Sequence, residues 1–231
     1  MRLILILGAT AALAGCNRDA PDNRATETEK IAPQPTSPQR TIQASFDCAR
    51  ANGQAQELVC GDAGLAAMDR EVARLAGLAA EPAAAAEWAM KRNGCWKSDE
   101  LRQCVVAAAM LEIHRLRKGS ETARGGEGLS VGPVAYSCKG ISGPVLATFV
   151  TGDPGAVALD WSGEAVAIEQ VTTASGDRYD GRWNGQPYGF WNKGAEATLT
   201  VPGKGDLLCV EQAASHRLER VLAVPRVRVQ R

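Results

Sequence analysis

Two hydrophobic periods divide the chain. Up to about residue 118, apolar side chains recur every three or four positions, the spacing of one helix face; from about residue 131 they alternate with polar ones, the spacing of a half-buried strand. The helical sets are Leu65, Met68, Val72, Leu75 and Ala79, and then Leu101, Val105, Ala108 and Leu111. The alternating sets are Tyr136 and Cys138, then Val157, Leu159 and Trp161, and later Ala197, Leu199 and Val201. The pattern predicts a helical region followed by an all-β region.

Capping residues indicate where the helices begin and end. We expect Asp62 to cap the first long helix, Ser98 or Asp99 to start the second, and Lys118-Gly119 to end it. Between them, the segment EPAAAAEWAMKRNGC predicts a short helix with Pro82 in its first turn. Two long helices packed as a hairpin bury only one seam, so this small domain is expected to need disulfides.

Turn signals in the second half recur at short intervals: Gly152-Asp153-Pro154-Gly155, Ser162-Gly163, Asn184-Gly185 and Pro202-Gly203. They predict roughly seven or eight short strands in a small antiparallel barrel or sandwich. Residues 17–44 are polar and rich in proline, which is typical of a disordered tether. The segment KGSETARGGEGLS, residues 118–130, is rich in glycine, serine and charge and predicts a linker at 119–130 after the helix end at Lys118. The sequence therefore predicts two domains, a helical one at 45–118 and a β domain at 131–231.

The first residues, MRLILILGATAALAGCNRD, have the form of an export signal. One arginine precedes an apolar run at 3–14, which is too short to span a membrane as a mature helix. The end of the run, Leu13-Ala14-Gly15-Cys16, resembles the lipobox of bacterial lipoproteins. This resemblance implies removal of residues 1–15 and acylation of Cys16, and Asn17 resembles the pattern that sorts lipoproteins to the outer membrane, here facing the periplasm. The alternative is an ordinary signal peptide that ends in Gly-Cys.

The cysteine count agrees with an acylated Cys16. Seven cysteines are present, and setting Cys16 aside leaves six: Cys48, Cys60, Cys95, Cys104, Cys138 and Cys209. Six thiols in an exported chain indicate three disulfides, although about fifteen pairings are possible from the sequence alone. A bond between Cys138 and Cys209 would tie the first strand to one of the last.

Several classes of function are disfavoured. The 26 basic and 26 acidic residues argue against a nucleic-acid partner, which would require a basic face. His114 and His216 lack metal-ligand spacing, and there is no glycine-rich phosphate loop, so we expect no metal and no cofactor. Ser175 and Lys193 could form a Ser-Lys hydrolase pair, but both are expected on exposed loops, where a lysine is not activated. The sequence therefore favours a protein that is not an enzyme.

The segment ASGDRYDGRWNGQPYGFWNKG, residues 174–194, has two interpretations. By its pattern alone it is a long hairpin with polar loops, in which Tyr179, Trp183, Phe190 and Trp191 pack in the core or across strands. The other interpretation comes from a resemblance. Tyr136-Ser137-Cys138, SGDRY at 175–179, FWNKGAEATL at 190–199 and Cys209 make residues 134–211 similar to the family of membrane-bound inhibitors of c-type lysozyme.

The resemblance implies an eight-stranded antiparallel barrel with a disulfide between its first and last parts, Cys138–Cys209. It also implies that Ser175 and Lys193 project into the lysozyme cleft. Their motif neighbours, expected in the same binding region, are Gly176, Arg178, Tyr179 and Gly194. Asp177 departs from the family, which has a small apolar residue there; Arg178 or the basic surface of lysozyme is expected to neutralise it.

The helical region resembles a second family, the LprI-like lysozyme inhibitors. The matching segments are residues 45–75 and 88–104, and the similarity extends over about 45–117. It implies the pairs Cys48–Cys60 and Cys95–Cys104. Asp69 and Arg70 are expected on a solvated helix face, and no binding residue is assigned to this domain.

Together these features predict an envelope lipoprotein, lipid-anchored in the outer membrane, that binds and inhibits c-type lysozyme and so protects peptidoglycan. The alternative is a structural or glycan-binding envelope lipoprotein without inhibitory activity, in which the tryptophans would matter more than Lys193. The basic tail at 212–231 is expected to add a last strand through Val221–Val224.

Overall fold

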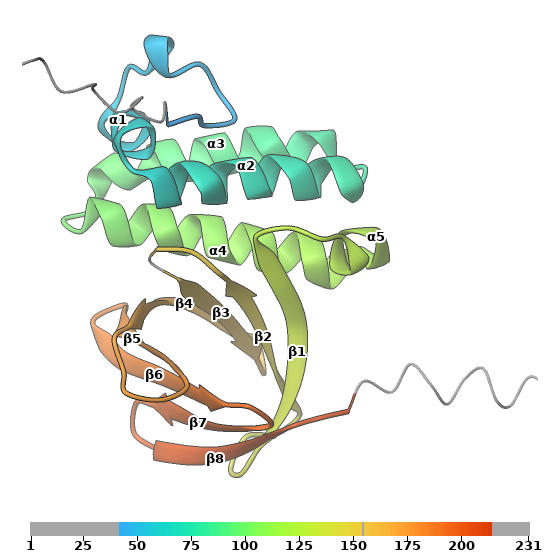
Figure 1. Cartoon of the computed structure of the whole chain (residues 1–231). Helices are drawn as coiled ribbons and strands as arrows, with labels where there is room; N and C mark the ends of the chain where they lie inside the picture. The colour runs from blue at the N-terminus through green and yellow to red at the C-terminus, as the bar shows by residue number, and fades with distance from the viewer. Residues whose placement is uncertain (1–41, 154, 214–231) are drawn as a thin grey trace, which may run out of the picture. The chain divides into compact units, whose positions relative to one another are not determined.

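The structure, a computed structural model, describes residues 42–153 and 155–213 and consists of a layer of helices above a β-barrel (Figure 1). The described helices and strands belong to one compact unit. The expectations for the export signal, for Cys16, for the tether up to residue 41 and for a strand at Val221–Val224 lie outside the described residues. The last part of the expected tether, residues 42–44, is described, and there the prediction was wrong, because Ile42 and Ala44 are partly buried against the helical core. None of the helices in the described part is both long and apolar enough to cross a membrane.

Five α-helices and two short 3₁₀ segments form the helical region. In chain order they are η1 (Cys48–Arg50), α1 (Gln54–Gly61), α2 (Ala63–Leu78), α3 (Pro82–Gly94), η2 (Cys95–Lys97), α4 (Leu101–Gly119) and α5 (Glu121–Gly125). Asp62 caps α2 as expected, because its Oδ1 accepts from Gly64 N at 2.9 Å and from Leu65 N at 3.0 Å. Pro82 occupies the first turn of α3. The eight-residue α1 was not predicted, because it buries only Ala55 and Val59 and gives no helical period.

The boundaries of α4 and the linker differ from expectation. Helix α4 begins at Leu101, because the Ser98 hydroxyl accepts from Glu100 N at 3.1 Å and forms a turn ahead of the helix. The segment expected as a linker contains α5, whose Ser120 side chain accepts from Ala123 N, and the first strand already begins at Ser130. Whether the helices and the barrel fold as independent domains stays a prediction.

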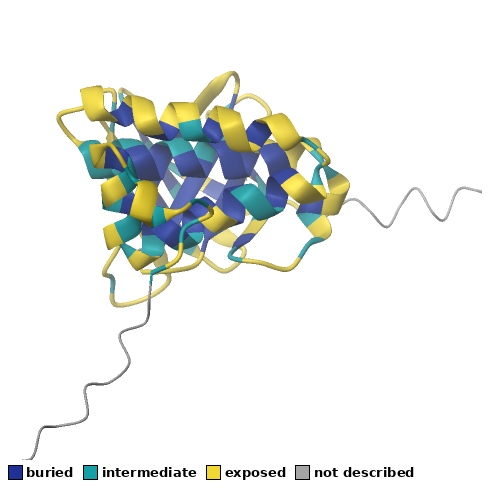
Figure 2. Cartoon of the chain, turned by 90° about the horizontal axis from the view of Figure 1, so that it is seen from above, coloured by how far each residue is buried: buried dark blue, intermediate teal, exposed yellow. Residues whose placement is uncertain are grey.

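Helix α4 is buried on two sides, because α2 and α3 pack on one side of it and strands β1–β4 on the other. Of the predicted apolar face, Val105 is buried as expected, whereas Leu101, Ala108 and Leu111 are only half-buried. The buried apolar positions extend around the helix beyond this face: Val105, Val106, Ala107, Ala109, Met110, Ile113 and Leu116. Figure 2 shows the helices from above, with buried positions in dark blue and exposed ones in yellow.

Asp69 lies in the interior of the helical region, and the expectation of a solvated position for it was wrong. Its side chain is 0% exposed and accepts from Trp88 Nε1 at 2.7 Å, from Arg92 Nη1 at 2.9 Å and from the backbone N–H of Ser45. The guanidinium of Arg92 also lies 4.2 Å from the ring centroid of Phe46. This network holds the segment around residues 45–46 against α2 and α3. Arg70, in contrast, is exposed, as expected.

Eight antiparallel strands form a closed barrel in which each strand pairs with its neighbours in sequence and β8 pairs with β1. The strands are β1 (Ser130–Cys138), β2 (Pro144–Val150), β3 (Ala156–Trp161), β4 (Glu164–Val171), β5 (Asp177–Trp183), β6 (Gln186–Lys193), β7 (Glu196–Val201) and β8 (Gly205–Glu211). The predicted fold class, a disulfide-bonded helical region followed by an eight-stranded barrel, is confirmed. The interior contains the large side chains Tyr136, Leu159, Ile168, Phe190 and Leu199.

Three disulfides join the pairs that the resemblances imply. Cys48–Cys60 and Cys95–Cys104 link segments of the helical region. Cys138 and Cys209 are directly opposite each other where β1 pairs with β8, and their disulfide crosses the strand pair that closes the barrel. A covalent link there fixes the register of the closing pair.

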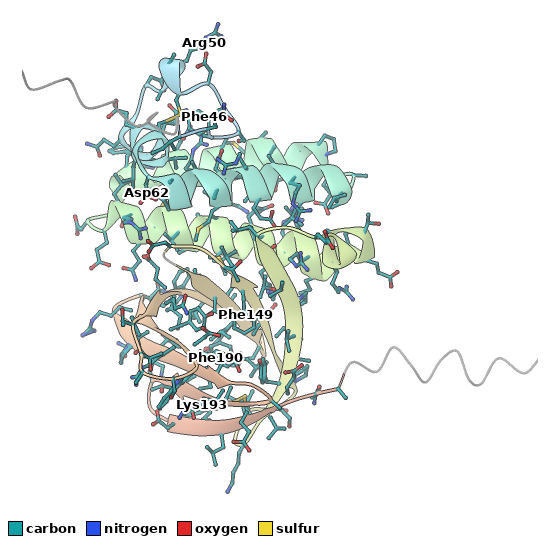
Figure 3. All side chains as sticks on the ribbon, viewed as in Figure 1. Phe46, Arg50, Asp62, Phe149, Phe190 and Lys193 are labelled. Atoms are coloured by element: carbon teal, nitrogen blue, oxygen red, sulfur yellow. A yellow bond between two sulfur atoms is a disulfide. The ribbon has the colours of Figure 1, made fainter. Side chains whose placement is uncertain are left out.

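Polar contacts join α4 to each of the strands β1–β5, and Arg117 donates to the Gly132 carbonyl of β1 at 2.7 Å. His114 lies between Thr148 Oγ1 at 2.8 Å and Asp160 Oδ2 at 3.3 Å, and Arg102 pairs with Glu169. Gln103 Nε2 donates to the carbonyl of Arg182 at 2.5 Å. The helices therefore cover one side of the barrel, and they leave the opposite ends of β5 and β6 uncovered. Figure 3 shows Lys193 on the part of the barrel away from the helices.

Candidate functional site

The candidate site is the edge of the barrel where the β4–β5 loop meets the end of β6. The β4–β5 loop ends in Ser175 and Gly176, directly before β5 begins at Asp177, and Asp177 is opposite Asn192 of β6. Lys193 is the last residue of β6 and is opposite Glu196, across the β6–β7 turn. Because two hairpins meet here, two residues eighteen positions apart in sequence come to one exposed edge.

Backbone contacts bring Ser175 close to Lys193. A Cβ added to Gly176 would lie 2.4 Å from the carbonyl oxygen of Asn192 and 3.1 Å from Lys193 Cγ, so the loop packs tightly against the end of β6. The carbonyl of Ser175 accepts from Trp191 Nε1 at 3.0 Å. Both Ser175 and Lys193 are exposed. The structure therefore unites the two residues that the sequence analysis singled out.

The ammonium of Lys193 lies over the indole of Trp191, with Nζ 3.4 Å from the ring centroid. This is a close cation–π contact. Arg178, directly opposite Trp191 in the β5–β6 pair, places its guanidinium 5.5 Å from the same centroid. The half-buried indole of Trp191 therefore lies beside two cations, Arg178 from β5 and Lys193 from its own strand, β6.

Arg178 does not pair with Asp177, contrary to one of the two expectations for that carboxylate. Its Nε lies 2.5 Å from Asp180 Oδ2, because residues 178 and 180 share the outer face of β5. Asp177 Oδ1 instead accepts from Gln170 Nε2 at 2.9 Å. Asp177 is therefore an exposed acidic group beside Ser175, held by a neutral amide.

Tyr179 does not face the exposed edge. It is 5% exposed and lies inside the barrel, with its ring centroid 5.8 Å from that of Phe149. Burial, together with the nearby carboxylate of Asp177, raises the pKa of Tyr179 to about 12. Because side chains alternate along a strand, Arg178 points out of the barrel and Tyr179 points into it. The expectation that Tyr179 lies in the exposed binding region was therefore wrong about its exposure. Tyr179 therefore contributes to the barrel core beneath the edge and not to its exposed surface.

Gly176 and Gly194 both have backbone conformations that favour glycine, with φ of +68° and +71°. They differ in their surroundings, since no atom lies within 4 Å of a Cβ added to Gly194. Gly194 therefore serves the β6–β7 turn, whereas Gly176 also permits the close approach of the Ser175 loop to β6.

A Gly176→Ala substitution is expected to displace the Ser175 loop, because a methyl group would overlap the Asn192 carbonyl and the left-handed conformation itself costs roughly 1–2 kcal/mol. The matched control is Gly203→Ala, where φ is +76° but no atom lies within 4 Å. In melting experiments both variants should be less stable than the parent. In a lysozyme inhibition assay only Gly176→Ala should be weaker, on the order of tenfold; equal inhibition by the two variants would show that the close approach is unimportant.

No catalytic or metal centre is evident in the described residues. His114, Thr148 and Asp160 are arranged like a catalytic triad, but Thr148 is 0% exposed and no substrate can reach its hydroxyl. Burial lowers the pKa of His114, against the opposing effect of Asp160. Across residues 42–153 and 155–213, no group of three or more His, Cys, Asp or Glu side chains is placed to hold a metal ion. Lys193 is exposed, which does not suit a lysine that activates a serine.

Comparison with known proteins identifies the family that the barrel resembles. Residues 136–208 match the model of the family described as membrane-bound lysozyme-inhibitor of c-type lysozyme. The match contains the end of β1, all of β2–β7 and the first part of β8, and it includes Ser175 and Lys193. The resemblance inferred from the sequence is confirmed.

The similarity to LprI extends over both regions of the chain. Proteins named Lipoprotein LprI from Mycobacterium bovis and from two strains of Mycobacterium tuberculosis are 28% identical to it over 212 residues. These alignments span 88% of this chain and 96% of each relative. The helical region followed by the barrel is thus aligned with almost the full length of those lipoproteins.

Sequence reasoning missed the part that Trp191 plays at this edge. It assigned Trp191 to packing, together with Phe190. The signal was available in the alternation of FWNK: Phe190 is 1% exposed inside the barrel, so Trp191 and Lys193, at odd positions, share the outer face.

Proposed function

We propose that this protein is a lipoprotein of the bacterial cell envelope that binds c-type lysozyme and inhibits it by inserting the edge formed by Ser175 and Lys193 into the active-site cleft. One observation carries the proposal. Ser175 and Lys193 are both exposed and lie next to each other on one edge of the barrel, within the segment that matches the inhibitor family. The similarity to a named lipoprotein along nearly the whole chain supports the envelope location.

The chemistry of such a cleft suits this edge. A retaining glycosidase of the lysozyme type holds two carboxyl groups about 5 Å apart. A lysine ammonium is a compact cation on a long stem, so it can enter a narrow site and pair with a carboxylate. A serine hydroxyl can donate to one carboxyl oxygen and accept from a protonated acid. Ser175 and Lys193 therefore provide a hydroxyl and an ammonium, both of which two carboxyl groups can bind.

Asp177 limits how the edge approaches lysozyme. It is exposed beside Ser175 and has no basic partner among the described residues, because its carboxylate accepts from the neutral amide of Gln170. A carboxylate facing an acidic cleft is repelled. We infer that Asp177 meets the basic rim of the enzyme, while Lys193 reaches the acids inside.

The helices support the barrel from the opposite side. They pack on β1–β4, whereas Lys193 lies on the part of the barrel away from them (Figure 3), and Ser175 beside it is exposed. An enzyme as large as lysozyme could therefore approach the edge without displacing α4.

The test of the proposed function is a lytic assay. The chain without residues 1–16 is added to a c-type lysozyme and a peptidoglycan suspension, and the decline in turbidity is followed. The proposal predicts dose-dependent protection of the peptidoglycan that saturates near one inhibitor per enzyme. Unchanged lysis at a large molar excess would refute it and leave a structural or glycan-binding role as the better account.

We further propose that the mature protein begins at Cys16, carries acyl chains on that residue and faces the periplasm from the outer membrane. The lipobox and the odd number of cysteines motivate this proposal. Several acyl chains on one residue anchor a protein much more firmly than one chain does. The intact mass of protein extracted from membranes should equal that of residues 16–231 plus the lipid; an unmodified Cys16 would show that the leader is an ordinary signal peptide.

A further inference from the structure

Trp191 contacts both of the residues that are proposed to enter the lysozyme cleft. Its indole N–H donates to the Ser175 carbonyl at 3.0 Å, and its face lies 3.4 Å from the Lys193 ammonium. One side chain thus contacts both residues of the proposed inhibitory edge. No other described side chain contacts both of them in this way.

We propose that Trp191 is the positioning residue of the edge, which fixes the Ser175 loop through its N–H and holds the Lys193 ammonium in place through its ring before lysozyme arrives. This inference rests on the proposed function for its effect on inhibition. Its structural part, the restraint of Lys193 in the free protein, can be tested without lysozyme.

The restraint matters because a lysine side chain has many rotamers. An exposed lysine loses most of this freedom when it is held in a binding site, and that loss weakens binding. A lysine already held against an indole loses less on binding, so the complex is tighter for the same final contacts. The ring suits this role, since a cation–π contact at an exposed site is weak enough to exchange for a carboxylate.

The bond to the Ser175 carbonyl has a different effect. The loop before β5 has no strand partner at Ser175, and Gly176 adopts the left-handed conformation next to it. The Trp191 N–H supplies a fixed donor to this loop. Gly176 lets the loop come close enough for that bond, since a Cβ there would lie 2.4 Å from the Asn192 carbonyl oxygen. The indole therefore sets the spacing between the serine and the lysine.

Two substitutions separate these effects. Trp191→Phe keeps an aromatic face for Lys193 but removes the N–H, whereas Trp191→Leu removes both. We expect inhibition to weaken about threefold for Trp191→Phe and about tenfold for Trp191→Leu. The matched control is Trp96→Leu in η2, because Trp96 is also exposed and also has a lysine over its ring, Lys97 at 5.6 Å, but lies in the helical region. Trp96→Leu should inhibit like the parent.

A double-mutant cycle distinguishes positioning from direct contact with the enzyme. If Trp191 acts through Lys193, then Trp191→Leu should weaken inhibition much less in a Lys193→Ala background than in the parent, by about threefold at most. An equal loss in both backgrounds would show that Trp191 acts independently of Lys193, and it would overturn the proposal. Melting temperatures of all variants report whether the barrel remains folded.

A nuclear magnetic resonance comparison of the chain without residues 1–16 tests the free state. The methylene protons next to Lys193 Nζ should be shifted upfield by the indole ring, and the shift should disappear in Trp191→Leu and be retained in part in Trp191→Phe. Random-coil shifts for Lys193 in the parent would overturn the proposal. If the parent shows the ring shift but does not inhibit lysozyme, the proposed function fails while the restraint stands, so the two failures are distinguishable.

Discussion

Lys193→Ala is expected to weaken inhibition of a c-type lysozyme by about thirtyfold or more. In the complex the ammonium would be desolvated against a carboxylate, and truncating one partner of such a pair costs roughly 2–5 kcal/mol. Because Lys193 is exposed in the free protein, its loss should barely change stability. Inhibition constants for parent and variant, with thermal melting beside them, measure both effects.

Matched variants sharpen this result. Lys204→Ala removes an exposed lysine from the turn at the other end of β7 and should inhibit like the parent. Ser175→Ala should weaken inhibition less than Lys193→Ala, on the order of tenfold, because it removes a single hydrogen bond to a charged group. Lys193→Arg should also inhibit poorly, since a planar guanidinium does not match a site for a compact ammonium. If Lys193→Ala inhibits as well as the parent at equal stability, Lys193 is not the inserted residue.

Asp69→Ala is expected to lower the free energy of unfolding by roughly 3–5 kcal/mol. The substitution leaves the buried guanidinium of Arg92 without its carboxylate and removes the acceptor for Trp88 Nε1 and Ser45 N. Breaking a buried pair by removing one partner has this magnitude, because the remaining charge stays buried without compensation. Urea unfolding at neutral pH measures the change.

The control for this prediction is Glu81→Ala. Glu81 pairs with Arg115 at 2.8 Å, but both side chains are about two-fifths exposed, at 41% and 43%. Exposed pairs contribute roughly 0–1 kcal/mol, so this variant should unfold almost like the parent. A loss of less than about 1 kcal/mol for Asp69→Ala would contradict the interpretation of Asp69 as an anchor for the helical region.

Periodicity in the sequence predicted the order and type of most elements, because helices and strands that bury one face leave a clear pattern. It was incomplete for α4, because burial on two sides broadens the apolar pattern of this helix beyond the predicted face of Leu101, Val105, Ala108 and Leu111. It was wrong for Asp69, because a carboxylate on a helix is usually solvated and its partners Trp88 and Arg92 come from another helix. Such a network depends on how neighbouring helices pack, and the apolar pattern of one helix carries no information about that packing.

The candidate site was predictable only in part. Ser175 and Lys193 were named through a family resemblance, since nothing in the spacing of eighteen residues shows that they meet. Their proximity depends on the register of β5 with β6 and on the close approach at Gly176. Alternation along β6, in contrast, did carry the information that Trp191 and Lys193 share one face, opposite to Phe190.

The most direct test of the central claim, that the Ser175–Lys193 edge occupies the active-site cleft, is a competition measurement. The affinity of the chain without residues 1–16 for a c-type lysozyme is measured at increasing concentrations of an oligosaccharide that fills the cleft without being cleaved. Insertion into the cleft predicts that the apparent dissociation constant rises in proportion to one plus the ratio of oligosaccharide concentration to its own dissociation constant. An affinity that does not change when the cleft is saturated would place the contact elsewhere and contradict the account.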